Sequence, residues 1–451
     1  MSFGARPVVS SLARLAWALA LFSAGTACRS KNPAPPAPSA RPPASSPAAP
    51  QAARCRSLSG GAGLVVGTAS GPPKVADEDG ELELPFATAT GSAVAVSGGF
   101  AVGGIGARER RSEAFVAFVP ADGKPGTSVS LTAVHGDPDP PLVAPDGAGA
   151  LVAVETSDAG GRALELFRVF PNGEKPLRGA EVTGVGEGGA TLAAAETSSV
   201  LVWTTGKAER STLRAAGVTP GAPQTLAAID LPGTEDAESP VLRARPGGFW
   251  LAWIAEKPAL DAGARESADA GEETRPLDSA PRVLFVAPLG AEGRPSGAPR
   301  AVSGAESHVV AFDAATLADG ALGLAWREDD AAPGVESGGT ELGRVAPDGA
   351  VSRGRAADET LSAGAPSLVR EEGPPHRVWL LAPGEDDRLR MALVAPNGTS
   401  TSPFVADESL RGAEILAALP GKACGKEPCQ TLLLARAKQR AVELSVAECR
   451  P

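Results

Sequence analysis

Two stretches that decide the fold are VAPDG (345–349) and VAPNG (394–398), each of which ends an apolar run. Asp-Gly and Asn-Gly supply the positive φ angles that tight hairpin turns require. Related turns occur earlier, as VPADG (119–123), VFPNG (169–173), VTPG (218–221) and VAPLG (286–290). Their closing glycines lie 50, 48, 69, 59 and 49 residues apart along the chain. This spacing predicts an internal repeat of about 50 residues.

A second pattern lies upstream of each turn: an apolar run without strict alternation, typical of a strand covered on both faces. These runs are GGFAVGGI (98–105), GALVAVE (149–155), SVLVWTT (199–205), GGFWLAWIA (247–255), GALGLAWRE (320–328) and RVWLLAP (377–383). We therefore expect four strands in each unit: a lead strand, the buried strand, an alternating strand and a short strand after the turn. Repeats of this size and strand number resemble the blades of a β-propeller, which implies an all-β ring.

The number of turns predicts seven blades. Six turns are complete, and a seventh would fall near residue 448, so the last blade (about 411–448) has only three strands. The segment ELELPFATA (81–89) resembles the short outer strand SPFVAD (402–407). We infer that an N-terminal strand completes the last blade and closes a propeller domain over residues 55–451. The run GAGLVVGTA (61–69) has no place in this count and is interpreted as an extra strand or a cap. At the other end, residues 435–448 are strong helix formers, so a terminal helix is the alternative to the predicted strands there.

The N-terminus predicts export. Residues 1–14 carry Arg6 and Arg14 and no acid, and the 13 residues that follow are apolar but too short to span a bilayer. Residues 1–27 therefore fit a secretory signal peptide. Cys28 directly follows small residues and resembles the lipobox of bacterial lipoproteins, which implies a lipid on Cys28. Gly25 stands where that family usually has Leu, which leaves plain secretion as the alternative.

The segment after the signal predicts a tether. Residues 28–54 are rich in Pro, Ala and Ser, a composition that cannot bury apolar surface and favours extended polyproline conformation. At about 3.1 Å per residue it would reach roughly 80 Å. Such a tether would hold the folded domain away from a membrane surface.

Five cysteines suggest two disulfides. Lipidation of Cys28 leaves four thiols. We expect Cys55 to pair with Cys449, joining the ends of the folded region, and Cys424 to pair with Cys429 across a short loop. A zinc site is disfavoured because no second close cysteine pair exists and the three histidines, His135, His308 and His376, lie far apart. We expect neither a metal nor a cofactor.

Composition narrows the functional classes. Gly and Pro number 96 of 451 residues, which argues against long helices. The formal net charge is −11, which argues against binding of nucleic acid. No G-x-S-x-G or phosphate-binding loop occurs, and we interpret GVGEGG (184–189) as a loop between blades. Trp203, Trp253 and Trp326 lie at equivalent points of three buried strands, where core packing is favoured over an aromatic binding platform.

The loops between buried and alternating strands should all lie on one face of the ring, and their charges are unevenly spread. We expect an acidic arc over blades four to six and a basic arc over blades seven and one, which together we call the partner face. Its acids include Glu328, Asp329, Asp330, Glu385, Asp386 and Asp387, and its bases are Arg108, Arg110, Arg111, Arg436, Lys438 and Arg440. A face divided in this way would orient a charged partner; the alternative is that loop tips are charged for solubility.

These features favour a monomeric, membrane-anchored propeller that acts as a non-catalytic scaffold or recognition module for a protein partner at the cell envelope. In plan alone (signal, cysteine, propeller) it resembles the eight-bladed lipoprotein subunit of the outer-membrane protein assembly machine. The alternative is an enzyme, a glycan hydrolase or lyase with carboxylates at the central channel. Clustered inward-facing charges would favour the enzyme, and small apolar residues the scaffold. A sugar binder is a third option, disfavoured by the 4% aromatic content and the absence of Tyr.

Overall fold

The computed structural model describes the chain over the following residues. They are 54–58, 64–66, 90–108, 111–131, 136–147, 149–158, 161–206, 211–219, 221–256, 281–305, 307–328, 340–356, 365–383, 389–406, 410–420, 429–438 and 441–450. The chain divides into two units, Met1–Ala49 and Pro50–Pro451, and every described residue belongs to the second. Within the described ranges no helix is both long enough and apolar enough to cross a membrane.

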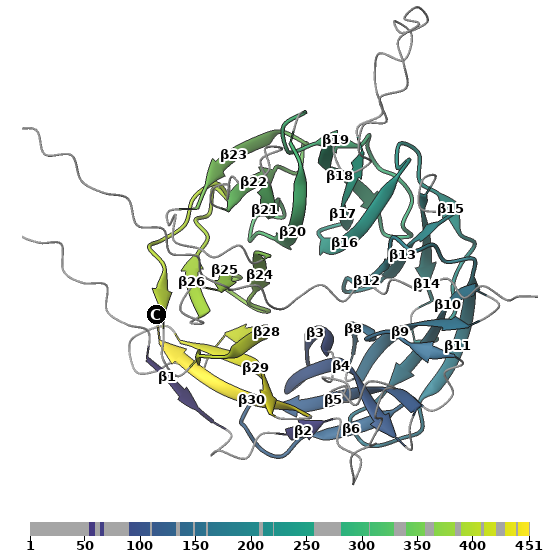
Figure 1. Cartoon of the computed structure of the whole chain (residues 1–451), viewed down its shortest axis with the longest axis vertical. Helices are drawn as coiled ribbons and strands as arrows, with labels where there is room; N and C mark the ends of the chain where they lie inside the picture. Colours follow the sequence, from purple (N-terminus) through teal and green to yellow (C-terminus); the bar gives the residue numbers. More distant parts are fainter. Residues whose placement is uncertain are drawn as a thin grey trace, which may run out of the picture. The chain divides into compact units, whose positions relative to one another are not determined.

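The second unit is a ring of seven antiparallel sheets, which confirms the predicted seven-bladed β-propeller (Figure 1). The blades follow one another around the ring in chain order. Blade one consists of β3 (Thr90–Val96), β4 (Gly99–Arg108), β5 (Arg111–Pro120) and β6 (Thr127–Ser130). Blade two consists of β7 (Asp137–Pro138), β8 (Leu142–Asp146), β9 (Gly149–Asp158), β10 (Gly161–Val169) and β11 (Leu177–Thr183). Because β7 and β8 both pair with β9, together they form one interrupted innermost strand.

Blades three to six each have four strands, paired in sequence order from the axis outward. Blade three has β12 (Ala190–Ala194), β13 (Ser199–Thr205), β14 (Thr212–Val218) and β15 (Ile229–Asp230). Blade four has β16 (Ala237–Arg245), β17 (Gly248–Glu256), β18 (Arg282–Gly290) and β19 (Arg300–Ala301). Blade five has β20 (Val309–Thr316), β21 (Leu322–Glu328), β22 (Glu341–Val345) and β23 (Val351–Arg355). Blade six has β24 (Ser367–Arg370), β25 (Val378–Pro383), β26 (Leu389–Leu393) and β27 (Val405–Ala406).

The N-terminal part of the unit completes blade seven. Its three C-terminal strands are β28 (Ala413–Pro420), β29 (Gln430–Lys438) and β30 (Ala441–Arg450). The outer position is taken by β1 (Arg54–Ser57) and β2 (Leu64–Val66), both paired with β30. Closure by an N-terminal strand is thus confirmed, but the strand is not the one expected at 81–89, which lies outside the described residues. The run 61–69 supplies β2, and the alternative of a terminal helix over 435–448 is wrong.

Apolar packing between neighbouring blades explains why the repeat forms a ring. Across the described residues there is one buried cluster at each of the seven blade-to-blade contacts. The second strand of a blade is buried on both faces; β17, for example, has eight buried residues in succession. Trp203, Trp253 and Trp326 are at most 2% exposed and lie inside three of these clusters, which confirms core packing. A lone blade would leave this surface in water.

The glycine turns behave as predicted except in blade four. Gly349 and Gly398 have φ angles of 87° and 69°, and the N–H of each donates to the carbonyl three residues earlier. In VAPLG (286–290), however, the chain stays extended, because β18 continues to Gly290. The turn instead falls at Gly293, with a φ of 82° and a hydrogen bond from its N–H to the Gly290 carbonyl. Gly293 therefore closes the turn that the sequence pattern assigned to Gly290.

Candidate functional site

Most of the irregular strand pairings among the described residues lie on the innermost strands. In β3, β16, β20 and β28 the pairing with the next strand shifts, so that the inner strand has one more residue than its partner. In blade two, β7 and β8 are separated at the corresponding place. Such bulges bend a strand and redirect its side chains, and they are common beside functional sites. These strands are therefore the first place to look for a site.

Polar side chains on innermost strands join three blades to the blade that follows. In three places a side-chain oxygen accepts a hydrogen bond from the backbone N–H of the following blade's innermost strand. The pairs are Ser92 with Val143 (2.5 Å), Thr191 with Leu242 (3.1 Å) and Asp313 with Leu368 (2.8 Å). The spacing in sequence is 51, 51 and 55 residues, about one repeat, so the contact follows the internal repeat.

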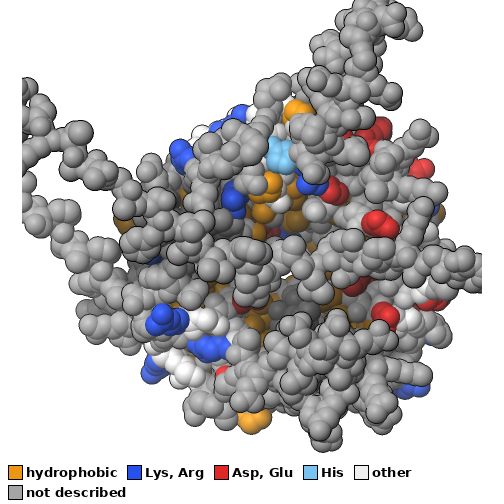
Figure 2. Space-filling view, in the orientation of Figure 1, with side chains coloured by type: hydrophobic (Ala, Val, Ile, Leu, Met, Phe, Trp, Pro, Cys, Tyr) orange, Lys and Arg blue, Asp and Glu red, His pale blue; other side chains and the backbone are white. Residues whose placement is uncertain are grey.

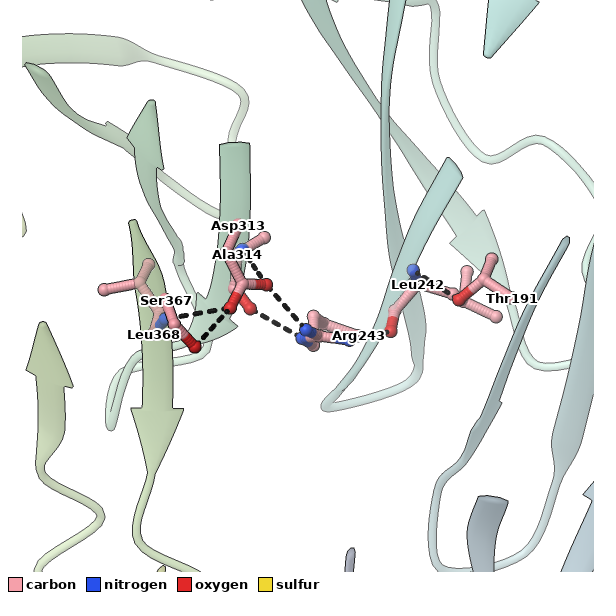
Figure 3. A network of polar contacts seen from close by, with 7 residues as sticks. All are labelled: Thr191, Leu242, Arg243, Asp313, Ala314, Ser367 and Leu368. Carbon is pink, nitrogen blue, oxygen red and sulfur yellow. Dashed lines mark hydrogen bonds and ion pairs between the residues drawn. The ribbon is translucent and has the colours of Figure 1, made fainter. Parts of the chain in front are cut away.

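The largest of these contacts is an ion pair between blades four and five (Figure 3). Arg243 on β16 donates from Nη2 to Asp313 Oδ1 on β20 at 2.8 Å, and from Nε to the Ala314 carbonyl at 2.5 Å. Asp313 Oδ1 also accepts the Ala314 N–H at 2.7 Å, while Oδ2 accepts the Leu368 N–H of blade six. The side chains are 37% and 20% exposed. Both charges are therefore engaged in joining three blades.

A second group of charges lies at one end of blade two. Arg162 on β10 donates to Glu155 on β9 at 2.6 Å, and the Asp139 N–H donates to the Glu155 carbonyl at 2.8 Å. Burial raises the pKa of Glu155, the Asp139 charge raises it further, and Arg162 opposes both effects. Desolvation also raises the pKa of Asp139. Two neighbouring carboxyl groups with raised pKa values are typical of acid–base sites, and also of structural charge clusters.

A third group lies beside the contact of blades four and five. Glu328 Oε1 accepts hydrogen bonds from the Ser307 hydroxyl at 2.8 Å and from the Trp326 indole at 2.7 Å. Burial raises the pKa of Glu341 and the Glu328 charge adds to this, whereas Arg355, 3.4 Å away, lowers it. This carboxylate pair belongs to β21 and β22, away from the innermost strand.

Most of the predicted partner face lies outside the described residues. Of its twelve residues, the side chains of Glu328 and Arg436 are described, and Arg436 Nη1 donates to the Ser445 hydroxyl at 3.3 Å. Arg108, Arg111 and Lys438 are placed by backbone alone, at the ends of β4, β5 and β29. The remaining seven, Arg110, Asp329, Asp330, Glu385, Asp386, Asp387 and Arg440, are among the residues that are not described. The division of this face into arcs stays a prediction.

Figure 2 shows the charge that is described on one face of the ring. Most Asp and Glu side chains lie over the half of the ring that contains β9 to β18, and most Lys and Arg over the half that contains β22 to β30 (Figures 1 and 2). In blade two, against the opposing effect of burial, the charges of Glu155 and Asp139, together with that of Glu187 in the linker that follows β11, raise the pKa of Arg162. The described charge is thus uneven around the ring.

The cysteines are partly as expected. Cys55 and Cys449 form a disulfide between the directly paired strands β1 and β30, which confirms that pairing. Beside it Arg56 Nη2 lies 2.6 Å from Glu448 Oε2. Cys28 and Cys424 lie outside the described residues, so the lipid site and the second disulfide stay predictions. Cys429 Sγ is within hydrogen-bond distance of Glu448 Oε1, at 3.3 Å. In the described segments no three His, Cys, Asp or Glu side chains are grouped to hold a metal.

Sequence reasoning missed both Arg243–Asp313 and Asp139–Glu155. The available signal was a charged residue inside an otherwise apolar lead strand, as in VLRAR (241–245) and VVAFDAAT (309–316). The predicted loop at 184–189 is confirmed: it joins β11 to β12.

Comparison with known proteins gives a fold and no family. No family model matches the chain, and no curated protein matches it. Among solved structures, the β-propeller domain of the Trilobed protease from Pyrococcus furiosus is 10% identical, with a TM-score of 0.46, over 80% of this chain and 97% of that one. The polysaccharide lyase Uly1 is 8% identical, with a TM-score of 0.50, over 80% and 89%. At these identities the likeness is one of fold alone. The seven antiparallel sheets of the ring make the chain a seven-bladed β-propeller.

Proposed function

We propose that the chain is an exported, lipid-anchored propeller that serves as a non-catalytic recognition module, or scaffold, for a protein partner at the bacterial cell envelope. The signal-like residues 1–27, Cys28 and the Pro-rich tether support export and anchoring. The propeller would then be carried on the Pro-rich tether, and its loop-bearing face would be free to meet a partner.

The observation that carries the non-catalytic role is the use of charge on the innermost strands. Arg243 and Asp313 are bonded to each other and to backbone groups of blades four, five and six. A catalytic acid or base needs a lone pair or proton available to substrate. Here both carboxylate oxygens of Asp313 accept backbone N–H groups, so the pair favours cohesion of the ring over chemistry.

Affinity purification of the tagged full chain from native membranes, with mild cross-linking and mass spectrometry, tests the proposal. We expect one envelope protein in stoichiometric amount. Recovery of the chain alone after cross-linking would contradict the scaffold role. The triple reversal Arg436→Glu, Lys438→Glu and Arg440→Glu should weaken capture. The matched reversal of Lys124 and Arg294, in turns at the other end of the blades, should not. Equal capture by both variants would show that the basic residues of the partner face do not bind the partner.

The anchor has its own test. Cells fed an alkyne-labelled fatty acid should attach the label to the full chain, and Cys28→Ser should abolish labelling and release the protein from membranes. An unlabelled wild-type protein would leave plain secretion as the explanation of the signal.

The second candidate function is a glycan hydrolase or lyase, favoured by the raised pKa values of Asp139 and Glu155 beside Arg162. On this reading, one carboxyl group stays protonated to act as an acid at a pH where an ordinary one is ionised. Incubation of the protein with envelope polysaccharides would then release new reducing or unsaturated ends, and Asp139→Asn and Glu155→Gln would each stop the release.

A further inference from the structure

Arg245 is the last residue of β16 and lies beside the contact between blades four and five. Its guanidinium carbon is 4.7 Å from the ring centroid of Trp250, which is 1% exposed and donates to the Gly320 carbonyl of blade five. Arg245 Nε donates to the Phe249 carbonyl at 3.1 Å, and Nη2 donates to the Ser296 hydroxyl at 3.3 Å. Stacking on a buried ring and two hydrogen bonds therefore hold the guanidinium in one place.

The charge of Arg245 is not neutralised by the chain. Arg245 forms no ion pair within the described residues, and its hydrogen-bond partners are a carbonyl and a hydroxyl. Burial lowers the pKa of Arg245, because desolvation disfavours the charged form. By contrast, other half-buried arginines form ion pairs with Asp or Glu, namely Arg162, Arg168, Arg214, Arg243, Arg282, Arg344, Arg370 and Arg377. Charge that is removed from water is normally paired, so Arg245 calls for a specific explanation.

One nitrogen of Arg245 is available to a ligand. Nη1 makes no hydrogen bond within the described residues. Buried side-chain nitrogens without a hydrogen bond include Nε of Arg344 and Nε of Arg370, but Nη1 of Arg245 is not one of them, so it is reachable from solvent. Ser296 is exposed, and because its hydroxyl oxygen accepts from Nη2, its own proton can be donated to a ligand. Arg245 and Ser296 thus present two donors side by side.

We propose that Arg245 and Ser296 bind a carboxylate group, carried by a small organic acid or by the C-terminus of a polypeptide. One carboxylate oxygen accepts from Arg245 Nη1 and the other from the Ser296 hydroxyl. A single guanidinium charge balances a carboxylate, whereas a doubly charged phosphate would keep one charge uncompensated. Because the guanidinium is already fixed on Trp250, little side-chain entropy is lost on binding. The site lies at the β16–β17 and β18–β19 turns, at the end of the blades opposite the predicted partner face, and does not depend on that face.

Saturation-transfer nuclear magnetic resonance of the full chain tests the site with two pairs of probes. Benzoate and benzamide have nearly the same shape and differ in charge. Acetyl-alanyl-alanine with a free C-terminus and its C-terminal amide form the second pair, which represents a polypeptide. We expect at least one acid to bind saturably and about tenfold or more tightly than its amide, the value of one hydrogen bond to a charged group. Binding of benzoate indicates a small organic acid, and binding of the peptide acid without benzoate indicates a polypeptide.

Three variants assign the binding to this site. Arg245→Gln should lower the affinity for the acid to that of the amide. The matched control is Arg300→Gln, which removes the same charge from an exposed position on β19 of the same blade and should leave the affinity unchanged. Ser296→Ala removes only an exposed hydroxyl, so it should keep the fold and weaken binding about three- to tenfold. Equal affinity for acid and amide in both pairs would overturn the site, as would equal effects of the Arg245 and Arg300 changes or unchanged binding in Ser296→Ala.

Discussion

At the scale of single residues, a partly buried ion pair on the innermost strands joins neighbouring blades. Asp313 shows this most clearly, because it accepts from Arg243, from Ala314 and from the Leu368 N–H of the next blade. Removing one partner of such a group leaves donors without acceptors, which costs more than the net value of the bonds themselves. The residue is therefore more important to the ring than its partial exposure suggests.

Replacing Asp313 by Ala should lower the free energy of unfolding by about 1–3 kcal/mol, because two backbone N–H groups and a guanidinium lose their acceptor. Asp313→Asn should cost less, since the amide oxygen still accepts the Leu368 N–H. The control is Glu292→Ala, which removes the exposed Glu292–Arg294 pair and should change stability by less than about 0.5 kcal/mol. Denaturant titration measures all three, and equal effects of the Asp313 and Glu292 changes would contradict the assigned role.

The Asp139–Glu155 pair should make stability depend on pH. Both carboxyl groups have folded pKa values above their ordinary 3.8 and 4.5, so the folded state holds protons that the unfolded state has released. Their contribution is therefore most favourable below those values and is lost as pH rises through the raised folded pKa values. Asp139→Asn should stabilise the protein more at pH 7 than at pH 4, and should lower the pKa of Glu155.

Carboxyl ¹³C titration of wild type and Asp139→Asn, together with unfolding at the two pH values, checks this prediction. If the pKa of Glu155 does not move in the variant, the two carboxyl groups do not interact as described.

At the scale of elements, turns and strands differ in how far the sequence defines them. The hairpin turns are defined by glycines at positive φ, a requirement that few other residues meet. Strand β1 is only four residues long and reads RCRS, without apolar periodicity, so nothing local marks it as the outer strand of blade seven. Its place follows from pairing with β30, nearly 400 residues away in sequence. The expectation of 81–89 rested on local composition, and local composition does not encode such a pairing.

The corrected turn of blade four predicts different effects on stability for alanine at two glycines of the same hairpin. Gly293→Ala should destabilise the protein by about 1–2 kcal/mol, because Gly293 has a φ of 82°. Gly290→Ala should be nearly neutral, since Gly290 is in a strand and the nearest atom to an added Cβ lies 3.7 Å away. Thermal or denaturant unfolding of both variants decides between the two turn positions. The reverse order would restore the turn at 286–290.

The disulfide should hold β1 on blade seven. Replacing Cys55 and Cys449 by Ser should cost about 2–5 kcal/mol, because the link restricts a long loop in the unfolded chain. Hydrogen exchange should show lost protection of the β1 amides, with those of β29 retained, since β29 is paired on both sides. Unchanged protection of β1 would mean that pairing alone closes the ring.

At the scale of the whole molecule, the repeat explains what sequence could and could not predict. The number of blades, the order of strands and the closure by the N-terminus all follow from a pattern that recurs about every 50 residues. The ion pair between blades four and five does not, because Arg243 and Asp313 lie 70 residues apart and only the curvature of the ring brings them together.

Disulfide mapping of the protein purified from native membranes tests the central claim, a seven-bladed ring closed by its own N-terminal strand. Proteolysis without reduction, followed by mass spectrometry, should recover one peptide pair that links Cys55 to Cys449. That result would support both the closure and passage through an oxidising compartment, as export requires. A link from Cys55 to Cys424 or Cys429, or a Cys55 recovered as the free thiol, would contradict it.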